Sequence, residues 1–133
     1  MRKMVKAKVL FVCIENSCRS QMAEAFANMY GQTVIKAYSS GSHPSGVVNS
    51  KAIKAMQKAG YDLSVHESKG LDAIPDISYD LVITMGCGDQ CPVVRAKARQ
   101  DWDIPDPKDM TMKKFIEVRD LICAKVQNLI KKI

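Results

Sequence analysis

The sequence predicts an α/β fold in which a parallel sheet is covered by helices on both faces. Short apolar or β-branched runs alternate with segments of helical spacing along the whole chain, which is the pattern of such folds. The 133 residues suffice for one domain (1–133) with its own core and are too few for two. No repeat, low-complexity tract or linker divides the chain.

The first half of the chain contains two strand signals separated by a helix. Residues 8–12 are an apolar run typical of a buried parallel strand. Residues 18–30 have helical spacing, and Gly31 follows as a stop signal. Residues 33–38 are β-branched and aromatic, which predicts a second strand. Residues 39–46 are rich in Ser, Gly and Pro and predict a loop.

The second half repeats the alternation with weaker signals. Residues 49–59 begin with a capping side chain and predict a helix. Residues 64–74 favour a short helix that ends before a proline, and residues 79–85 predict a third buried strand. A short strand is possible near residues 100–104. The final helix is expected to begin at Thr111.

Composition and charge restrict the classes of protein. The net charge of +6 fits either a solvated basic surface or attraction for anionic ligands, and no nucleic-acid-binding signature accompanies it. We therefore expect no nucleic-acid partner. No apolar run reaches the roughly 18 residues of a membrane span, and the N-terminus does not resemble a signal peptide. We expect a cytoplasmic protein that acts as a monomer.

The chain has five cysteines, at positions 13, 18, 87, 91 and 123. In a reducing compartment an odd number of thiols favours free, catalytic or metal-binding cysteines over structural disulfides. His43 and His66 do not stand in a recognisable ligand spacing. We therefore predict no metal site and no cofactor.

The segment from Cys13 to Ser20 is the first candidate site, because a Cys-x5-Arg-Ser pattern stands between a strand and a helix. Such a loop directs successive backbone N–H groups and the helix dipole at one point, which favours both a bound anion and a thiolate. Arg19 can grip two oxygens of the anion. Ser20 can donate to the Cys13 sulfur, and Asn16 can brace the loop. The predicted oxyanion loop comprises Ile14, Glu15, Asn16, Ser17, Cys18, Arg19 and Ser20.

The alternative is that Cys13 ends a buried strand as a small apolar residue. A bare Cys-x5-Arg match is common by chance, so its position between strand and helix carries the functional interpretation. In open α/β sheets, ligands bind beyond the carboxyl ends of the strands. Cys13 directly follows the first strand and Cys87 closely follows the third, so both lie where a site is expected.

Asp106 is a second candidate, in a loop stiffened by Pro105 and Pro107 before the last helix. A protonated carboxyl held there can give a proton to an oxygen that leaves when Cys13 attacks. Taken alone, an Asp before Pro is more often a turn residue that makes local hydrogen bonds.

Cys87 and Cys91 form a third candidate in a glycine-bearing segment. If the first and third strands are neighbours, about 4.8 Å apart, Cys13 and Cys87 can approach the separation that a disulfide requires. Cys91 can then attack the Cys87 sulfur and move the disulfide outward. The alternative is two unrelated buried cysteines.

These features together resemble the thioredoxin-coupled arsenate reductases, which are built on the low-molecular-weight protein tyrosine phosphatase fold. The resemblance covers essentially the whole chain, and the loop, the paired thiols and the Asp-Pro occur in the family's order. It implies a four-stranded parallel sheet in the order 2-1-3-4. The matching segments are residues 11–13, 16–24, 38–41 and 81–85, then Cys87 with Cys91 and Pro92, and residues 102–107.

The resemblance also implies a mechanism and partners. Cys13 attacks arsenate, and Asp106 assists the loss of water. Cys87 then attacks Cys13 and releases arsenite, Cys91 resolves the Cys13–Cys87 disulfide, and thioredoxin reduces the resulting Cys87–Cys91 pair. Cys18 corresponds to a position that usually lies outside this relay, and Cys123 has no family role.

The sequence departs from the family at three places. First-described members have Gly where Glu15 stands, and a carboxylate near an oxyanion is unfavourable unless it points away. Those members bind potassium near positions matching Asn16, Glu24 and Ser39, but a further carboxylate of that site corresponds to Lys69 here, so no ion is expected. Finally, Cys87 and Cys91 are closer together, which leaves open another thiol reductant.

Two other functions compete with arsenate reduction. The first loop serves equally a phosphatase that hydrolyses phosphoesters through a Cys13 phosphoenzyme. Such phosphatases commonly have aromatic residues after the Asp-Pro, where this chain has Lys108-Asp109-Met110, and they have no chemical need for Cys87 and Cys91. The third hypothesis, a non-catalytic basic protein, lacks any binding motif.

Overall fold

The sheet that organises the molecule has four parallel strands in the order β2-β1-β3-β4. The structure is a computed structural model that describes residues 5–86 and 94–133. This order confirms the topology implied by the family resemblance. The strands are β1 (Ala7–Cys13), β2 (Ile35–Gly41), β3 (Tyr79–Thr84) and β4 (Ala96–Asp101).

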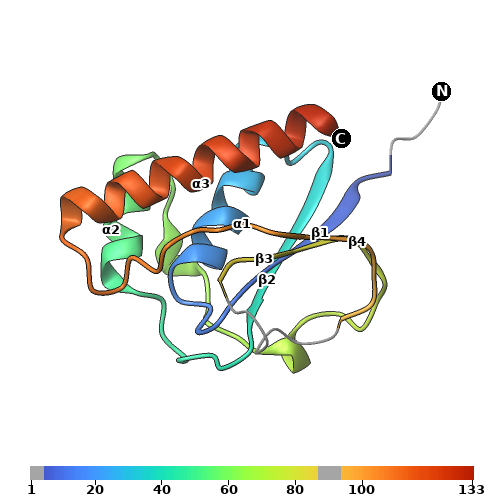
Figure 1. The fold of residues 1–133 in the computed structure, drawn as a ribbon, viewed down its shortest axis with the longest axis horizontal. Helices are drawn as coiled ribbons and strands as arrows, with labels where there is room; N and C mark the ends of the chain where they lie inside the picture. Colours follow the sequence, from blue (N-terminus) through green and yellow to red (C-terminus); the bar gives the residue numbers. More distant parts are fainter. Residues whose placement is uncertain (1–4, 87–93) are drawn as a thin grey trace.

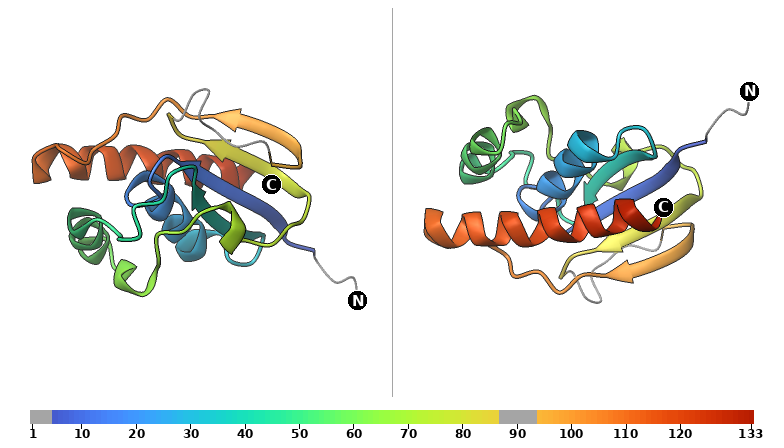
Figure 2. Two further views of the ribbon diagram at one scale, coloured as in Figure 1. Left: turned by 90° about the horizontal axis from the view of Figure 1, so that it is seen from below. Right: turned by 90° about the horizontal axis from the view of Figure 1, so that it is seen from above.

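The three α-helices lie on one side of the sheet: α1 packs on β1 and β2, α3 runs alongside α1, and α2 packs against α3 (Figures 1 and 2). They are α1 (Arg19–Tyr30), α2 (Ser50–Lys58) and α3 (Met112–Lys132). Alternate residues of β1, such as Val9 and Phe11, pack against buried side chains of these helices, including Phe26, Met56 and Ile122. Because side chains alternate along a strand, the residues between them face the opposite side.

The opposite face of the sheet has a smaller core, centred on Leu10 and Val12. In the described part of the chain it is covered by the 3-10 turn η2 (Leu71–Ala73) and by Ile74 and Ile77. The expectation of helices on both faces is therefore met by three α-helices on one face and by a 3-10 turn on the other.

Several boundaries differ from the expected ones for identifiable reasons. The strand β2 extends through residues 39–41, which were expected to be a loop, because these residues pair with β1 as far as Cys13. The last strand begins at Ala96, earlier than the expected 100–104, and its exposed Ala-Lys-Ala-Arg-Gln-Asp sequence has no apolar alternation that would reveal it. The segment 64–74 contains the 3-10 turns η1 (Leu63–Val65) and η2, and no α-helix.

The helix starts agree with the capping signals. The Asn49 side chain accepts from the backbone N–H of Lys51, and Thr111 accepts from the N–H of Lys114. Among residues 5–86 and 94–133, no helix is both long enough and apolar enough to cross a membrane. The fold places Cys13 at the end of β1, in the middle of the sheet and close to the N-terminal end of α1.

The packing of α3 in the core on the helical face can be tested at two adjacent residues. Ile122 is fully buried and Leu121 is 39% exposed. We expect Ile122→Ala to lower the free energy of unfolding by about 2–5 kcal/mol, because it leaves a cavity. Leu121→Ala should change it by no more than about 0.5 kcal/mol. Urea unfolding measures both, and equal losses would contradict this packing.

Candidate active site

The segment 14–18 joins the end of β1 to the start of α1 in a tight loop. Asn16 has a φ of 51°, in the left-handed region, where Asn is better tolerated than most residues. Gly41 of β2 lies against this loop, and a Cβ there would be 2.5 Å from the Ile14 carbonyl oxygen. The loop therefore needs a residue without a side chain at position 41.

The carbonyl groups of the loop point outward. The Ile14 oxygen accepts from His43 N (2.8 Å), the Glu15 oxygen from Ser45 N (3.1 Å) and the Ser17 oxygen from Asn49 N (3.0 Å). Within the described ranges, the N–H groups of residues 14–20 donate to no protein acceptor. Free N–H groups of a loop at a helix N-terminus are the usual elements of an anion-binding nest, so the geometry is compatible with the predicted oxyanion loop.

The candidate nucleophile is buried at the floor of this loop. Cys13 is 3% exposed, and its Sγ lies 2.8 Å from Ser20 Oγ. Asn16 Nδ2 donates to the same Ser20 oxygen at 2.8 Å. Because that oxygen accepts from Asn16, the Ser20 hydroxyl hydrogen can be directed at the sulfur, where it stabilises a thiolate. The predicted roles of Ser20 and Asn16 thus have the required geometry.

A chain of hydrogen bonds supports Asn16 from behind. Gln21 Nε2 donates to Asn16 Oδ1 (2.8 Å) and to the Glu67 carbonyl (2.8 Å), and Gln21 Oε1 lies 2.9 Å from His66 Nδ1. Since an amide oxygen only accepts, His66 must carry its hydrogen on Nδ1. His66 Nε2 can then accept from the Tyr61 hydroxyl at 2.6 Å. Sequence reasoning missed Gln21 and His66 as supporting residues, because the contacts of His66 join distant parts of the chain.

A buried carboxylate, Glu24, lies next to His66 in this series of hydrogen bonds. Burial opposes its ionisation, but a hydrogen bond from His66, the charge of Lys69 and the Ser39 hydroxyl together hold the pKa of Glu24 below its ordinary value. The Lys69 ammonium lies 3.4 Å from Ser39 Oγ. The sequence departs from the family's potassium site at these positions. Here the Lys69 ammonium itself supplies a positive charge beside Glu24 and Ser39.

Arg19 supplies the second half of the anion site. Its side chain is only 6% exposed, Nη1 donates to the Ile104 carbonyl at 3.0 Å, and Nη2 lies 3.8 Å from Asp106 Oδ2. Gly86, at φ +74°, lies so close that a Cβ would be 2.5 Å from Nη1. Within the part of the chain that the structure describes, this buried guanidinium has one carbonyl partner and one distant carboxylate, and a bound oxyanion would add to its compensation.

Asp106 lies at the rim, as expected, with its side chain 49% exposed. Oδ1 accepts from the Lys108 N–H at 3.1 Å, the local turn bond typical of such an Asp, and Oδ2 faces Arg19. The turn interpretation and the catalytic one are therefore compatible. Trp102 and Ile104 are buried in the core and anchor the segment that leads to Asp106.

Glu15 turns its carboxylate toward the Asp106 segment. Both of its oxygens lie 3.0 Å from Lys108 Nζ, and this pairing raises the pKa of Lys108. The negative charge that seemed unfavourable for an oxyanion loop is therefore paired. Sequence reasoning missed Lys108, because it is 93 positions away from Glu15.

The second thiol of the loop differs from the first. Cys18 is 3% exposed, and burial raises its pKa to about 12. At neutral pH it is a protonated thiol inside the core cluster. Cys123, on α3, also has a pKa raised by burial. The expectation that Cys18 and Cys123 lie outside the relay stays a prediction.

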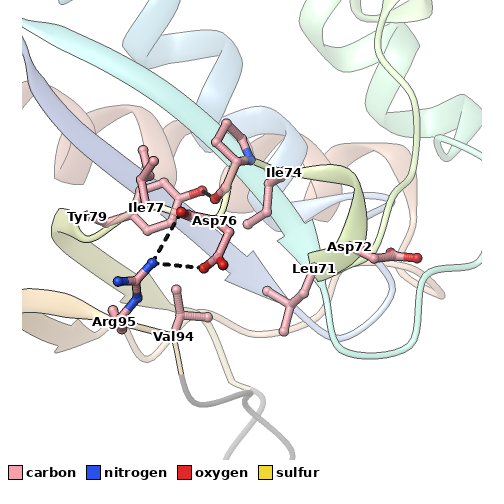
Figure 3. Close-up of a pocket in the computed structure, with 9 residues that line it drawn as sticks. Leu71, Asp72, Ile74, Asp76, Ile77, Tyr79, Val94 and Arg95 are labelled. Atoms are coloured by element: carbon pink, nitrogen blue, oxygen red, sulfur yellow. Dashed lines mark hydrogen bonds and ion pairs between the residues drawn. The ribbon is translucent and has the colours of Figure 1, made fainter.

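The two remaining predicted residues, Cys87 and Cys91, lie outside the described residues. In residues 5–86 and 94–133, no three His, Cys, Asp or Glu side chains gather where they could hold a metal ion. A cavity of about 560 Å³ opens between η2 and the start of β3 and contains none of the predicted site residues (Figure 3). Its polar feature is an exposed ion pair between Arg95 and Asp76 at 2.9 Å.

The contact between Gly86 and Arg19 gives a test of the anion site. We expect Gly86→Ala to displace the guanidinium and weaken the binding of inorganic phosphate about tenfold or more, because a charged hydrogen bond is lost. Gly60→Ala is the matched control: Gly60 also has a positive φ (+94°), but a Cβ there meets nothing within 4 Å. Titration calorimetry measures both affinities. Equal weakening would show that backbone strain alone is responsible.

Comparison with known proteins agrees with this geometry. The family described as low molecular weight phosphotyrosine protein phosphatase matches residues 8–133. A glutaredoxin arsenate reductase from Synechocystis sp. is 40% identical over 95% of this chain and 98% of its own.

Two solved structures extend the comparison. An arsenate reductase in a phosphate-binding state superposes with a TM-score of 0.86 at 39% identity, covering 96% of this chain and 98% of its own. A thioredoxin-dependent arsenate reductase from Corynebacterium glutamicum gives 0.77 at 29% identity, covering 96% and 61%. By its sequence and its fold, the chain belongs to the low molecular weight phosphotyrosine protein phosphatase family.

Proposed function

We propose that this protein reduces arsenate to arsenite with Cys13 as the nucleophile. The observation that carries the proposal is the buried Cys13 sulfur, 2.8 Å from Ser20 Oγ, at the floor of the loop that leads to Arg19. Among residues 5–86 and 94–133, the N–H groups of this loop donate to no acceptor, and the Arg19 guanidinium has one carbonyl partner and a carboxylate at 3.8 Å. Such a site holds a tetrahedral oxyanion against a thiolate. The three relatives described above are named as arsenate reductases, and these names support arsenate as that oxyanion.

In the first step the Cys13 thiolate attacks arsenic(V) and an arsenic–sulfur bond forms. An arsenate oxygen leaves as water, with a proton supplied by Asp106. Asp106 lies within reach of Arg19, which we assign to the oxygens of the same anion. The free N–H groups of the loop stabilise the negative charge on the remaining oxygens.

The reducing electrons come from the thiols. Cys87 attacks the Cys13 sulfur, the sulfur–arsenic bond breaks, and its electron pair reduces arsenic(V) to arsenic(III), which leaves as arsenite. Cys91 then attacks Cys87, which regenerates the Cys13 thiolate and leaves a Cys87–Cys91 disulfide. Two electrons from an external dithiol, for which we propose thioredoxin, return the enzyme to its reduced state. Both thiols lie outside the described residues. The support for this relay is therefore the sequence and the name of the thioredoxin-dependent relative.

Phosphoester hydrolysis is the second candidate, because the family carries the phosphatase name and the same loop can form a phosphoenzyme. It requires Cys13, Arg19 and Asp106 but no further thiol. The two activities therefore separate at Cys87.

Two variants should separate them in practice. We expect Cys13→Ser to abolish both arsenate reduction and aryl phosphate hydrolysis, because the nucleophile is lost. Cys87→Ser should abolish multiple-turnover arsenite release and leave aryl phosphate hydrolysis within about twofold of wild type, a change typical of a substitution outside the attacking group. Arsenite release and p-nitrophenol formation are the measurements. Full arsenate reduction by Cys87→Ser would exclude the relay.

The reductant is tested by reconstitution. We expect arsenite release with thioredoxin, thioredoxin reductase and NADPH to exceed that with glutathione, glutaredoxin and glutathione reductase. One relative is named a glutaredoxin arsenate reductase and another a thioredoxin-dependent arsenate reductase, so the two systems must be compared at equal NADPH. Faster turnover with the glutathione system would replace thioredoxin in the proposal and leave Cys13 chemistry intact.

A further inference from the structure

An ion pair joins the two segments that border the anion site. Glu15 belongs to the oxyanion loop, and Lys108 follows Asp106 and Pro107 in the segment that carries the candidate proton donor. Lys108 Nζ lies 3.0 Å from both oxygens of Glu15, so the contact is bidentate. Neither residue is needed for the chemistry proposed above.

The position of Lys108 is coupled to that of Asp106. Lys108 N donates to Asp106 Oδ1 at 3.1 Å, and Pro107 between them has a fixed φ. Arg19 approaches Asp106 only at 3.8 Å, which is a weak restraint for a half-exposed carboxylate. The contact between Lys108 and Glu15 is therefore the shortest ion pair that ties this segment to the oxyanion loop within the described residues.

The pair also lies at the partly exposed rim of the loop. Cys13 is 3% exposed and Arg19 5%, so the reacting groups are nearly covered while Glu15 and Lys108 remain partly exposed at the rim. A free tetrahedral oxyanion needs little room beyond the loop. A cavity of about 350 Å³ beside the loop is lined by Glu15, Ser17 and Lys108, and an ester of the same oxyanion would place its organic group there.

We propose that the Glu15–Lys108 ion pair is a clasp that positions Asp106 over the oxyanion loop and makes the site select free oxyanions over their bulky esters. Arsenate as the favoured oxyanion rests on the proposed function, whereas the clasp itself rests only on the described contacts. Glu15 and Lys108 are positioning and selectivity residues and are not catalytic.

The charges of the two residues predict opposite effects on anion affinity. Without Lys108, the Glu15 carboxylate stands unpaired beside the oxyanion and repels it. Without Glu15, the Lys108 ammonium is free to attract it. Asp106 loses its restraint in both cases. A structural surface pair with no role would not produce this combination.

The experiment compares Glu15→Gln and Lys108→Gln, with Lys97→Gln as a matched control. Lys97 lies on the strand β4, outside the anion site, and forms an exposed ion pair of 3.2 Å with Asp80. For arsenate, both clasp variants should lower kcat about two- to fivefold, the effect of losing one partly exposed pair. KM should fall in Glu15→Gln and rise in Lys108→Gln. The ratio of kcat/KM for p-nitrophenyl phosphate to that for arsenate should rise in both.

Rescue separates positioning from simple loss of charge. The double variant Glu15→Lys with Lys108→Glu restores an attractive pair of reversed polarity, and it should recover most of the kcat that either single variant loses. The clasp would be overturned if both single variants changed no more than Lys97→Gln does. It would also be overturned if KM shifted in the same direction in both single variants, or if the double variant did not recover kcat.

Binding of inorganic phosphate distinguishes failure of the clasp from failure of the proposed function. Titration calorimetry with the reduced wild-type protein requires neither arsenate chemistry nor the Cys87–Cys91 pair. Tighter binding by Glu15→Gln and weaker binding by Lys108→Gln would support the clasp even if the protein reduced no arsenate. Equal dissociation constants in wild type and both variants would overturn it even if arsenate reduction were demonstrated.

Discussion

The outward hydrogen bonds of the loop carbonyls are the constraint on which the rest of the site depends. Backbone N–H groups of residues 42–49 donate to carbonyl oxygens of the loop, and this turns the loop's own N–H groups to the opposite side, where we propose that an oxyanion binds. A peptide plane has its N–H and C=O on opposite sides, so holding one group orients the other. The geometry of the proposed anion site thus depends on a neighbouring segment that lies on the carbonyl side of the loop.

The parts of the site that sequence predicts are those encoded by local spacing. Cys13, Arg19 and Ser20 could be identified because their roles follow from a strand–loop–helix pattern within eight residues. Asp106 could be proposed only as one of two interpretations. The structure shows its turn bond with Lys108 N and places its other oxygen 3.8 Å from Arg19, and the catalytic interpretation stays a prediction. The overall topology was predicted as well, because buried parallel strands have a strong apolar signal.

The rest could not be predicted, because it depends on contacts between distant residues. His66 supports the loop through Gln21 across 45 positions, and Lys108 meets Glu15 across 93. Neither lysine nor histidine carries a local signal for such a partner. Cys18 and Cys13 illustrate the same limit, since both are 3% exposed and only the contacts of each sulfur distinguish them. Cys13 Sγ lies 2.8 Å from Ser20 Oγ, whereas Cys18 Sγ lies 3.8 Å from Ser17 Oγ and has a pKa raised by burial.

The weak signal of β4 has a consequence for the behaviour of the protein in solution. β4 is an edge strand with five exposed residues in its sequence Ala-Lys-Ala-Arg-Gln-Asp, and an edge strand offers unpaired backbone groups to any other extended chain. Lys97 and Arg99 place like charges along this edge, so a second copy that adds its own β4 would bring cations together. The composition that hides the strand from sequence inspection thus protects the sheet from edge-to-edge aggregation.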